Sequence, residues 1–452
     1  MFAWPRLRSL GSGRPFVSVV TPVPRDCKDR VVGDEQAIPL SAEDRAILDL
    51  ECSWIAGHTC KLVSLGPGAP GIDELRGLID ERIPAAPELT RKLGGTEAEP
   101  AWVPDPEFDV ARHVRAVPRA GRDGELDEVA RLFEERLDRD RPLWAIDVIP
   151  RTGGGSVLVW RIHHALADGT AAMRFAERLI WDAEADPAAA ASAPRAAPGA
   201  APDRDDERRR GHLAAFIERE FAGSLHRSPF DGAVGTRRRI AVAEVPLGPL
   251  HDAAKELAGA TLNDAVLSVV AGSLRRWLER HRAALGDVRV RVPVSLHHEG
   301  DDAGNRDSFF SVRLPLGAGD PVERLRTVAR ETTVRKSEHD AERVERVAET
   351  LGEHSAKLAA LVERIESSPR EFAVSVSNVP GPRRPVSVLG APVEALHSIA
   401  EIGLRHGLRI SVVSLADRLY FGFNADPALV HDVEWMAEGV EIEAAELVGL
   451  AG

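Results

Sequence analysis

Two adjacent histidines, His163 and His164, precede an aspartate–glycine pair, Asp168 and Gly169, in the segment RIHHALADGT. A neutral imidazole is the side chain best suited to remove a proton from a hydroxyl near neutral pH, because its ordinary pKa lies close to that pH. Asp168 can hold the loop by accepting backbone N–H groups or by pairing with a cation. Gly169 is expected to let the chain turn tightly where a helix begins. The segment is therefore a candidate general-base site.

Two other interpretations of the histidine pair are weighed against this one. Two adjacent histidines by themselves are most simply a structural pair at a strand end. A metal site is disfavoured, because neighbouring strand residues point to opposite faces and one imidazole must face away. The complete pattern HHxxxDG rarely arises by chance in such a chain, and its strand–loop–helix context favours the functional interpretation.

The elements that must position these residues can be read from the hydrophobic pattern. Residues 156–162 (SVLVWRI) form a short apolar run typical of a strand, and residues 170–181 follow as a helix. A strand end can present an imidazole into a cleft. The clearest helix of the chain covers 261–280, where Thr261 and Asp264 have capping-box spacing.

Asn263 stands in the first turn of that helix, where asparagine is a mediocre helix former. Capping explains Asp264, but it leaves Asn263 unexplained. An amide at a helix N-terminus can donate to an oxyanion, assisted by the positive end of the helix dipole. Asn263 is therefore a second candidate for the chemistry.

Both halves of the chain mix helices and strands, which predicts an α/β or α+β architecture in two domains. Pro293 indicates a strand edge or a strand end. Helices are predicted at 41–51, 71–82 and 125–137, and strands at 288–294, 372–376, 409–415 and 419–423, the last two as a hairpin turning at 416–417.

The domain boundaries follow from composition. Residues 1–38 are predicted to be a disordered extension without the apolar core of a secretory signal. Residues 186–211 lie in a stretch rich in Ala and Pro that lacks large apolar residues, and they are predicted to be a linker. The predicted domains are 39–185, which contains the HHxxxDG pattern, and 212–452.

Charge and composition exclude several classes of function. The chain has 58 Lys+Arg and 71 Asp+Glu, a net charge of −13, which argues against nucleic acid as the partner. The sequence contains no run of about 18 consecutive apolar residues, so no transmembrane helix is expected. Three cysteines, an odd number in 452 residues, fit a reducing compartment, so we expect a cytoplasmic protein.

The HHxxxDG segment resembles the motif of the CoA-dependent acyltransferase superfamily, which includes chloramphenicol acetyltransferase and peptide-synthetase condensation domains. Further segments, in order, narrow the resemblance to the bacterial wax ester synthase/diacylglycerol acyltransferase family. They are RPLW at 141–144, LND at 262–264, VPVSL at 292–296, GNR at 304–306 and SNVPGP at 377–382. The similarity runs from about Leu40 to Leu447. One departure, AGHT at 56–59 in place of a Pro-Met-His-containing stretch, concerns lipid preference near the entrance rather than the chemistry.

The resemblance implies a fold and a set of roles. It implies two chloramphenicol-acetyltransferase-like domains, with mixed sheets flanked by helices and an active-site tunnel at the domain interface. His164 would be the base, His163 a neighbour that shapes the pocket, Asp168 a residue that holds the motif loop, and Asn263 an oxyanion donor. The resemblance also assigns Pro142, Leu143, Trp144, Asp264, Asn305, Ser377 and Asn378 to substrate binding or to the domain interface, where simple bracing is an equally open alternative.

The implied activity is O-acyl transfer from fatty acyl-CoA to the hydroxyl of diacylglycerol or a long-chain alcohol, giving triacylglycerol or wax ester. No acyl-enzyme, metal or bound cofactor is expected, and acyl-CoA is a co-substrate. Peripheral contact with a membrane or lipid bodies rests on the resemblance alone. Two alternatives stay open: an enzyme acting on polyketide, peptide or carrier-linked substrates, and a non-catalytic lipid-binding relative. The cation that pairs with Asp168 cannot be chosen among arginines such as Arg141 and Arg161.

Overall fold

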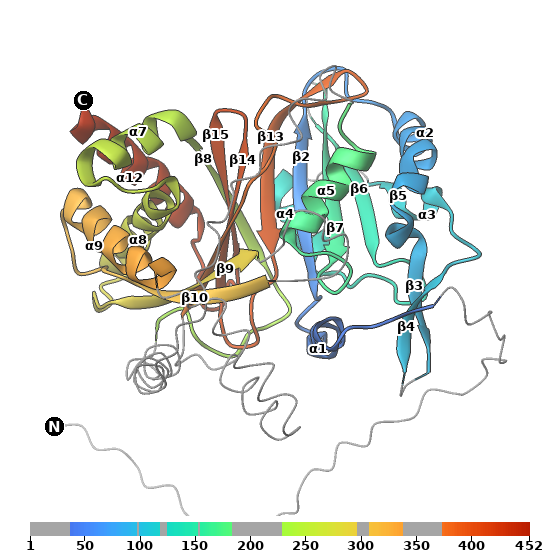
Figure 1. The fold of residues 1–452 in the computed structure, drawn as a ribbon, viewed down its shortest axis with the longest axis horizontal. Helices are drawn as coiled ribbons and strands as arrows, with labels where there is room; N and C mark the ends of the chain where they lie inside the picture. Colours follow the sequence, from blue (N-terminus) through green and yellow to red (C-terminus); the bar gives the residue numbers. More distant parts are fainter. Residues whose placement is uncertain are drawn as a thin grey trace, which may run out of the picture.

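Two six-stranded mixed sheets stand side by side in the computed structural model, which describes residues 37–96, 99–117, 124–151, 154–182, 228–295, 307–337 and 373–452 (Figure 1). The predicted linker at 186–211 lies outside these residues, so the domain boundaries drawn there stay predictions. The predicted extension overlaps the described chain at its end, where Ile38 already belongs to a short strand. The mixed α/β class expected from the sequence is confirmed.

The first sheet lies between two helices. α5 (Gly169–Leu179) covers one face, where its apolar side joins the core around β7, and α4 (Glu125–Glu134) covers the other face. The strands are, in spatial order, β12 (Ser387–Val388), β13 (Ala391–Ala400), β2 (His58–Leu65), β7 (Ser156–His163), β6 (Trp144–Pro150) and β5 (Val114–Ala116).

The second sheet is covered by helices on one face and turns its other face toward the first half (Figure 1). Its strands are, in spatial order, β10 (Asp307–Leu314), β9 (Val288–Ser295), β11 (Val374–Val379), β14 (Leu408–Leu415), β15 (Arg418–Ala425) and β8 (Arg239–Pro246). The covering helices are α7 (Leu247–Ala258), α8 (Leu262–Arg280), α9 (Pro321–Ser337) and α12 (Glu434–Ala451).

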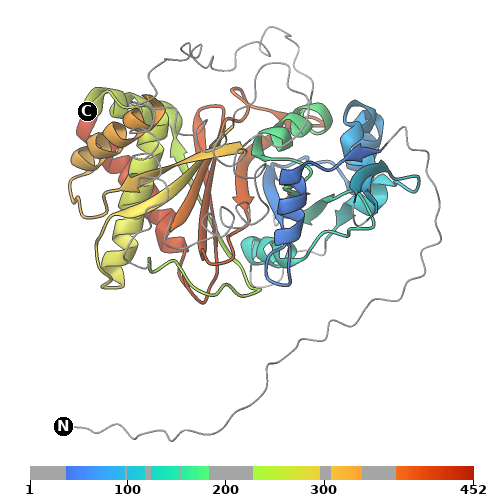
Figure 2. The same cartoon turned by 60° about the horizontal axis from the view of Figure 1, so that its bottom comes forward.

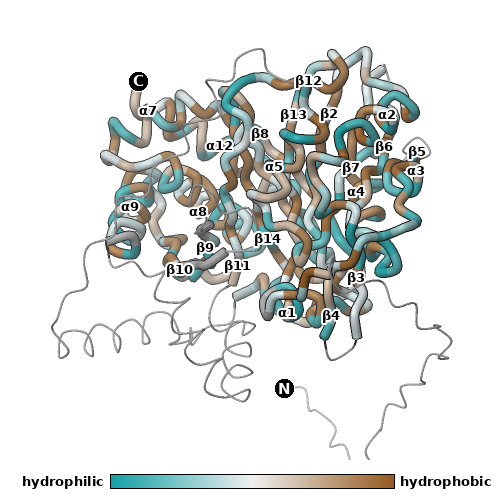
Figure 3. The backbone as a smooth tube through the Cα atoms, turned by 45° about the vertical axis from the view of Figure 1, so that its right-hand side comes forward, coloured by the Kyte–Doolittle hydropathy of each residue, from teal (hydrophilic) through white to brown (hydrophobic). Residues whose placement is uncertain are grey.

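Smaller elements surround the first sheet, and α1 lies below its central strands in Figure 1 and comes forward in Figure 2. They are α1 (Ala42–Leu50), α2 (Ile72–Arg82), η2 (Ile83–Ala85), η3 (Pro87–Thr90), α3 (Val110–His113), and a three-stranded sheet of β1 (Ile38–Pro39), β4 (Pro100–Pro104) and β3 (Arg91–Gly95). In the hydropathy colouring of Figure 3, long stretches of the strands are apolar, as expected for sheets covered on both faces.

The two halves are tied together by a strand that crosses between them. β13 comes from the C-terminal half, yet it pairs antiparallel with β2 and so completes the first sheet. It also packs closely on β15, where a Cβ added to Gly422 would lie 2.1 Å from the carbonyl oxygen of Ser398. The amide of Asn424 donates to the carbonyl of Ala400 at 2.9 Å. The two sheets are therefore held in fixed contact.

Most elements predicted from the hydrophobic pattern are confirmed, including the hairpin of β14 and β15. The helix predicted over 125–137 is shorter, because Glu135 already has an extended backbone. Pro293 does not mark an edge strand, since β9 lies between β10 and β11. The pairing of β9 with β11 ends at Arg291, so the missing N–H of Pro293 breaks no pairing on that side.

No single helix among the described residues is long and apolar enough to span a membrane. Among these residues, one pair of consecutive helices, α7 and α8, together has the length and composition of a membrane span, but the chain bends by 93° between them.

Candidate active site

The HHxxxDG segment is built at the end of β7. His163 is the last residue of this strand, and His164 follows it directly, with its backbone N–H donating to the carbonyl of Gly57 at 2.9 Å. The chain then turns, and Asp168 caps α5 by accepting the backbone N–H of Ala171 at 2.7 Å. Strand, loop and capped helix therefore occur as the sequence predicts.

The half-buried imidazole of His164 is kept neutral by its surroundings. Burial lowers its pKa from 6.5 to about 4, and the positive charge of Arg409 acts in the same direction, while Asp168 partly opposes both. Arg409 stands on β14, in the other half of the molecule. At neutral pH the ring can therefore accept a proton, which is what a general base must do.

This environment predicts the pH dependence of catalysis. In the wild type, kcat/KM should hold its plateau down to about pH 5 and fall only near the pKa of about 4, because His164 is unprotonated above that value. The variant R409Q removes a charge that lowers the pKa of His164, so its acid limb should move to higher pH. Measuring kcat/KM against pH for both proteins checks this. A limb at the ordinary imidazole pKa of 6.5 in both would contradict it.

His163 is held in place rather than exposed to substrate. It is 1% exposed, and its Nδ1 accepts the backbone N–H of Ala165 at 3.2 Å. In the neutral ring the hydrogen is therefore on Nε2, which lies 3.5 Å from Oε2 of Glu51. A Cβ added to Gly57, which has φ +71°, would lie 2.5 Å from the same Nε2. Glu51 and Gly57 thus fix the ring from two sides.

Glu51 is itself locked by arginines. Arg139 donates to its Oε2 at 3.0 and 2.8 Å, and Arg136 donates to Oε1 at 3.4 Å. Burial alone would raise the pKa of Glu51, but its bonds to His163 and Arg139 hold that pKa below its ordinary value. Glu51 is therefore a buried carboxylate that positions His163.

A glutamine at this position tests the role. The variant E51Q keeps the shape of the side chain but removes the charge that faces His163 and two arginines. We expect a fall of about tenfold in kcat and a loss of about 1–3 kcal/mol in the free energy of unfolding. Steady-state kinetics and denaturant titration measure the two effects. The exposed Glu107 supplies the control E107Q, and equal behaviour of the two variants would refute the role.

Pro142, Leu143 and Trp144, which also belong to the first half, support the end of β7 that carries His163. The carbonyl of Leu143 accepts the backbone N–H of His163 at 2.9 Å. The indole of Trp144 donates to the carbonyl of Leu89 at 2.7 Å and stacks on His113 with ring centres 4.5 Å apart. Pro142 is buried beside them, and its carbonyl accepts the N–H of Trp144 at 2.8 Å.

Gly169 is required for space and not for its backbone conformation. Its φ lies outside the left-handed region, so the expectation of a tight glycine turn is wrong. A Cβ at this position would instead come within 3.0 Å of Cγ2 of Val379, on β11 of the second half. Gly169 therefore lets the start of α5 approach the second sheet closely.

Neither arginine considered as a partner of Asp168 pairs with it. Arg161 bonds Asp147 at 2.8 Å, and Arg141 lies 3.4 Å from Asp138. The charge of Asp168 instead favours the protonated form of Lys61, whose pKa is lowered to about 8 by burial. Lys61, a buried lysine on β2, is thus one cation in the electrostatic environment of Asp168.

The second half supplies the N-terminus of α8. The amide of Asn378 donates to Oδ1 of Asn263 at 3.4 Å, which leaves the Nδ2 hydrogens of Asn263 as donors. The capping box is confirmed: Oδ2 of Asp264 accepts the N–H and the hydroxyl of Thr261 at 2.8 and 2.7 Å, and its Oδ1 accepts the hydroxyl of Thr332 at 2.6 Å.

Contacts along β11 bring the separate segments together. Val379 meets Gly169 of the motif loop, and its neighbour Asn378 bonds Asn263 of α8. Ser377 lies on the same strand, in register with Ser411 of β14. Asn305 lies outside the described residues. The motif loop that carries the candidate base and the helix that carries the candidate oxyanion donor thus come from different halves, and both approach β11.

Three residues of the site were not found from the sequence: Glu51, Gly57 and Arg409. Glu51 ends a predicted helix more than a hundred residues before His163, and no spacing links the two. Arg409 is the first residue of a predicted strand, and no spacing links it to His164. Of these three residues, only Gly57 lies in a stretch that the sequence analysis had singled out, AGHT at 56–59, which departs from the family pattern.

Comparisons with known proteins agree with one another. The model of the wax ester synthase/diacylglycerol acyltransferase catalytic domain matches residues 40–223, and that of the WS/DGAT C-terminal domain matches residues 303–447. Two proteins of Mycobacterium tuberculosis named as diacylglycerol O-acyltransferases are 30% identical to this chain. One match covers 78% of this chain and 82% of the relative, and the other covers 91% and 97%.

Solved structures show the same fold. The wax ester synthase/diacylglycerol acyltransferase from Marinobacter aquaeolei has a TM-score of 0.69 at 24% identity, covering 92% of this chain and 100% of that chain. The first condensation domain of the CDA synthetase has a TM-score of 0.55 at 18% identity, covering 91% and 97%.

Proposed function

Because the chain belongs to the wax ester synthase/diacylglycerol acyltransferase family, we propose that it transfers a fatty acyl group from acyl-CoA to the hydroxyl of a diacylglycerol or a long-chain alcohol. The family makes the chain an acyltransferase, and its substrates are an acyl donor and an acyl acceptor. The choice of acceptor, the identity of the base and the mechanism are parts of the proposal.

The observation that carries the proposal is the neutral imidazole of His164 at the meeting of the two halves. Its pKa of about 4 keeps it unprotonated at neutral pH and so able to accept a proton, and contacts through β11 connect its loop to the N-terminus of α8. A base on one side and a fixed amide donor on the other match the two charges that develop when an alcohol attacks a thioester.

In the proposed mechanism, His164 removes the proton from the acceptor hydroxyl as the oxygen attacks the thioester carbonyl. The Nδ2 hydrogens of Asn263 stabilise the oxyanion of the tetrahedral intermediate. When the intermediate collapses, the C–S bond breaks, the ester remains, and His164 returns the proton to the departing CoA thiolate. Every atom is accounted for without a covalent acyl-enzyme.

The environment of the cysteine on β2 supports direct transfer. Burial raises the pKa of the Cys60 thiol to about 12, so it is protonated and a poor nucleophile. Its side chain packs in the core beneath α4, on the face of the sheet away from α5.

We propose in addition that the protein works in the cytoplasm, at the surface of membranes or lipid bodies, where apolar acceptors accumulate.

The experiment is to measure CoA thiol release from palmitoyl-CoA with hexadecanol, with dioleoylglycerol and without acceptor. Release that depends on an acceptor supports O-acyl transfer, and the ratio of the two rates gives the acceptor preference. Release without acceptor would indicate a thioesterase. No release under any condition, from protein that is folded by circular dichroism, would refute the proposed substrates and favour carrier-linked donors.

A further inference from the structure

Two histidines and an aspartate meet at the C-terminal end of α8, away from the residues discussed so far. His281 caps the end of α8, and His431 and Asp432 lie in the turn before α12. His281 Nε2 is 3.3 Å from Oδ2 of Asp432, and His431 Nε2 is 4.0 Å from Oδ1. The three ligand atoms that the residues offer lie within 4.8 Å of one another.

The hydrogen bonding of His281 turns a lone pair toward the carboxylate. Its Nδ1 lies 2.8 Å from the carbonyl oxygen of Trp277, which can only accept, so Nδ1 carries the hydrogen. In the neutral ring, Nε2 then faces Oδ2 of Asp432, and two acceptors 3.3 Å apart repel each other. A positive charge between them, either a proton or a metal ion, turns this repulsion into attraction.

The surroundings hold the residues in the way that metal ligands are held. The N–H···O=C bond from His281 is the usual outer partner of a ligating histidine. The indole of Trp277 donates to Oδ1 of Asp432 at 2.8 Å and stacks on the His281 ring at 4.1 Å between ring centres. The ring of His431 stands edge-on to that of His281 at 5.1 Å.

We propose that His281, His431 and Asp432 bind one divalent transition-metal ion of the zinc class, with water in the remaining position. Two imidazoles and one carboxylate are a ligand set for Zn²⁺, Co²⁺, Ni²⁺ or Cu²⁺. Ligand atoms of a tetrahedral zinc site lie about 3.3 Å apart, given bonds of about 2.0–2.1 Å. The His281–Asp432 pair already has this separation. The side chain of His431, which is 66% exposed, can move to shorten its 4.0 Å distance from Asp432.

The proposed ion would join the end of α8 to the start of α12 and would take no part in acyl transfer, because Asn263 lies at the opposite end of the 19-residue α8. One nearby charge opposes it. The guanidinium of Arg280 lies 3.7 Å over the Trp435 ring, and its Nε is 3.7 Å from Oδ2 of Asp432. We therefore expect weaker binding than in a closed site with four protein ligands.

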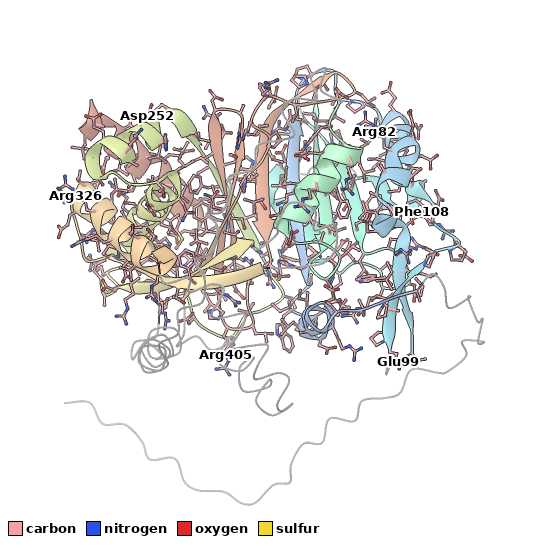
Figure 4. The ribbon with its side chains drawn as sticks, viewed as in Figure 1. Arg82, Glu99, Phe108, Asp252, Arg326 and Arg405 are labelled. Atoms are coloured by element: carbon pink, nitrogen blue, oxygen red, sulfur yellow. The ribbon has the colours of Figure 1, made fainter. Side chains whose placement is uncertain are left out.

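The chain offers a matched control on α7. His251 Nδ1 lies 3.4 Å from Oδ1 of Asp252, another histidine–aspartate pair, and the described residues give it no third ligand. Asp252 is on the outer surface of the second half (Figure 4). The variant H251A thus removes a surface histidine beside an aspartate without touching the proposed site.

The experiment uses the full-length chain freed of metal with a chelator. Zn²⁺ binding is measured by calorimetry, and Co²⁺ binding by its visible absorption, for the wild type and for H431A, D432N and H251A. We expect H431A and D432N each to lose one bound equivalent, or at least tenfold in affinity, while H251A behaves as the wild type. Zn²⁺ should also raise the Tm of the wild type and of H251A only.

Two results would overturn the proposal. One is equal metal binding by the wild type, H431A and D432N, or no binding by any of them, which would show that these residues hold no metal ion. The other is an equal loss in H251A, which would show non-specific binding to surface histidines. Because His431 is exposed, its replacement leaves the fold intact, and the far-UV circular dichroism of each variant checks this.

Discussion

Replacing His164 by alanine is expected to lower kcat about 10²- to 10⁴-fold, the contribution that a positioned general base makes to proton transfer. Burial keeps the imidazole unprotonated at pH 7, and the bond between His164 N–H and the carbonyl of Gly57 holds the backbone that carries it. Acceptor-dependent CoA release from H164A and wild type measures the loss.

The fold should not depend on the replaced ring. The bond from His164 to Gly57 uses backbone atoms, which the substitution leaves in place, so H164A should melt close to the wild type. H251A serves as the activity control, because His251 lies on α7 in the helix layer of the second half. Turnover by H164A within twofold of the wild type would exclude His164 as the base and with it the proposed mechanism.

Replacing Asn263 by alanine is expected to lower kcat about 10²- to 10³-fold, the usual effect of removing one oxyanion donor. The loss should appear in kcat and leave KM nearly unchanged, because negative charge develops on the carbonyl oxygen only in the transition state. Asn378 fixes which end of the Asn263 amide points away from β11, so the Nδ2 hydrogens are already oriented before substrate binds. Steady-state kinetics with palmitoyl-CoA check the prediction.

Two neighbours distinguish donation from packing. N378A removes only the 3.4 Å bond that orients Asn263, so its kcat should fall less than that of N263A. D264A removes the N3 partner of Thr261 in the capping box of α8 and should lower the free energy of unfolding by about 0.5–2 kcal/mol, with less effect on kcat than N263A. If N263A raised KM while leaving kcat intact, Asn263 would be a binding residue and the oxyanion donor would lie elsewhere.

The division of the site between two halves has a consequence for stability. His164 belongs to the first half, and Asn263 and Arg409 belong to the second, so the catalytic geometry depends on how the sheets pack. That packing rests on β13, which is paired to β2 and pressed against β15 at Gly422. Substitutions at the contact between β13 and β15 should lower activity without altering a catalytic side chain.

Local sequence determined the elements and the chemistry they carry. The apolar run before His163, the capping box at Thr261 and the apolar strand pattern of residues 409–415 each depend on neighbours a few positions away, so they could be read directly from the sequence. The candidate base and the candidate amide donor were found in the same way, because each stands beside a recognisable strand end or helix start.

Tertiary structure alone decided what surrounds these residues. The carboxylate of Glu51, the space at Gly57 and the charge of Arg409 reach the histidines from segments that are distant in the chain, and neither periodicity nor spacing encodes such pairings. The same holds for β13, whose pairing with β2 gives no local signal in either strand. The sequence by itself therefore determined which residues could do the chemistry, and the packing of the two sheets determined their ionisation and orientation, because burial and charge depend on contacts between segments far apart in the chain.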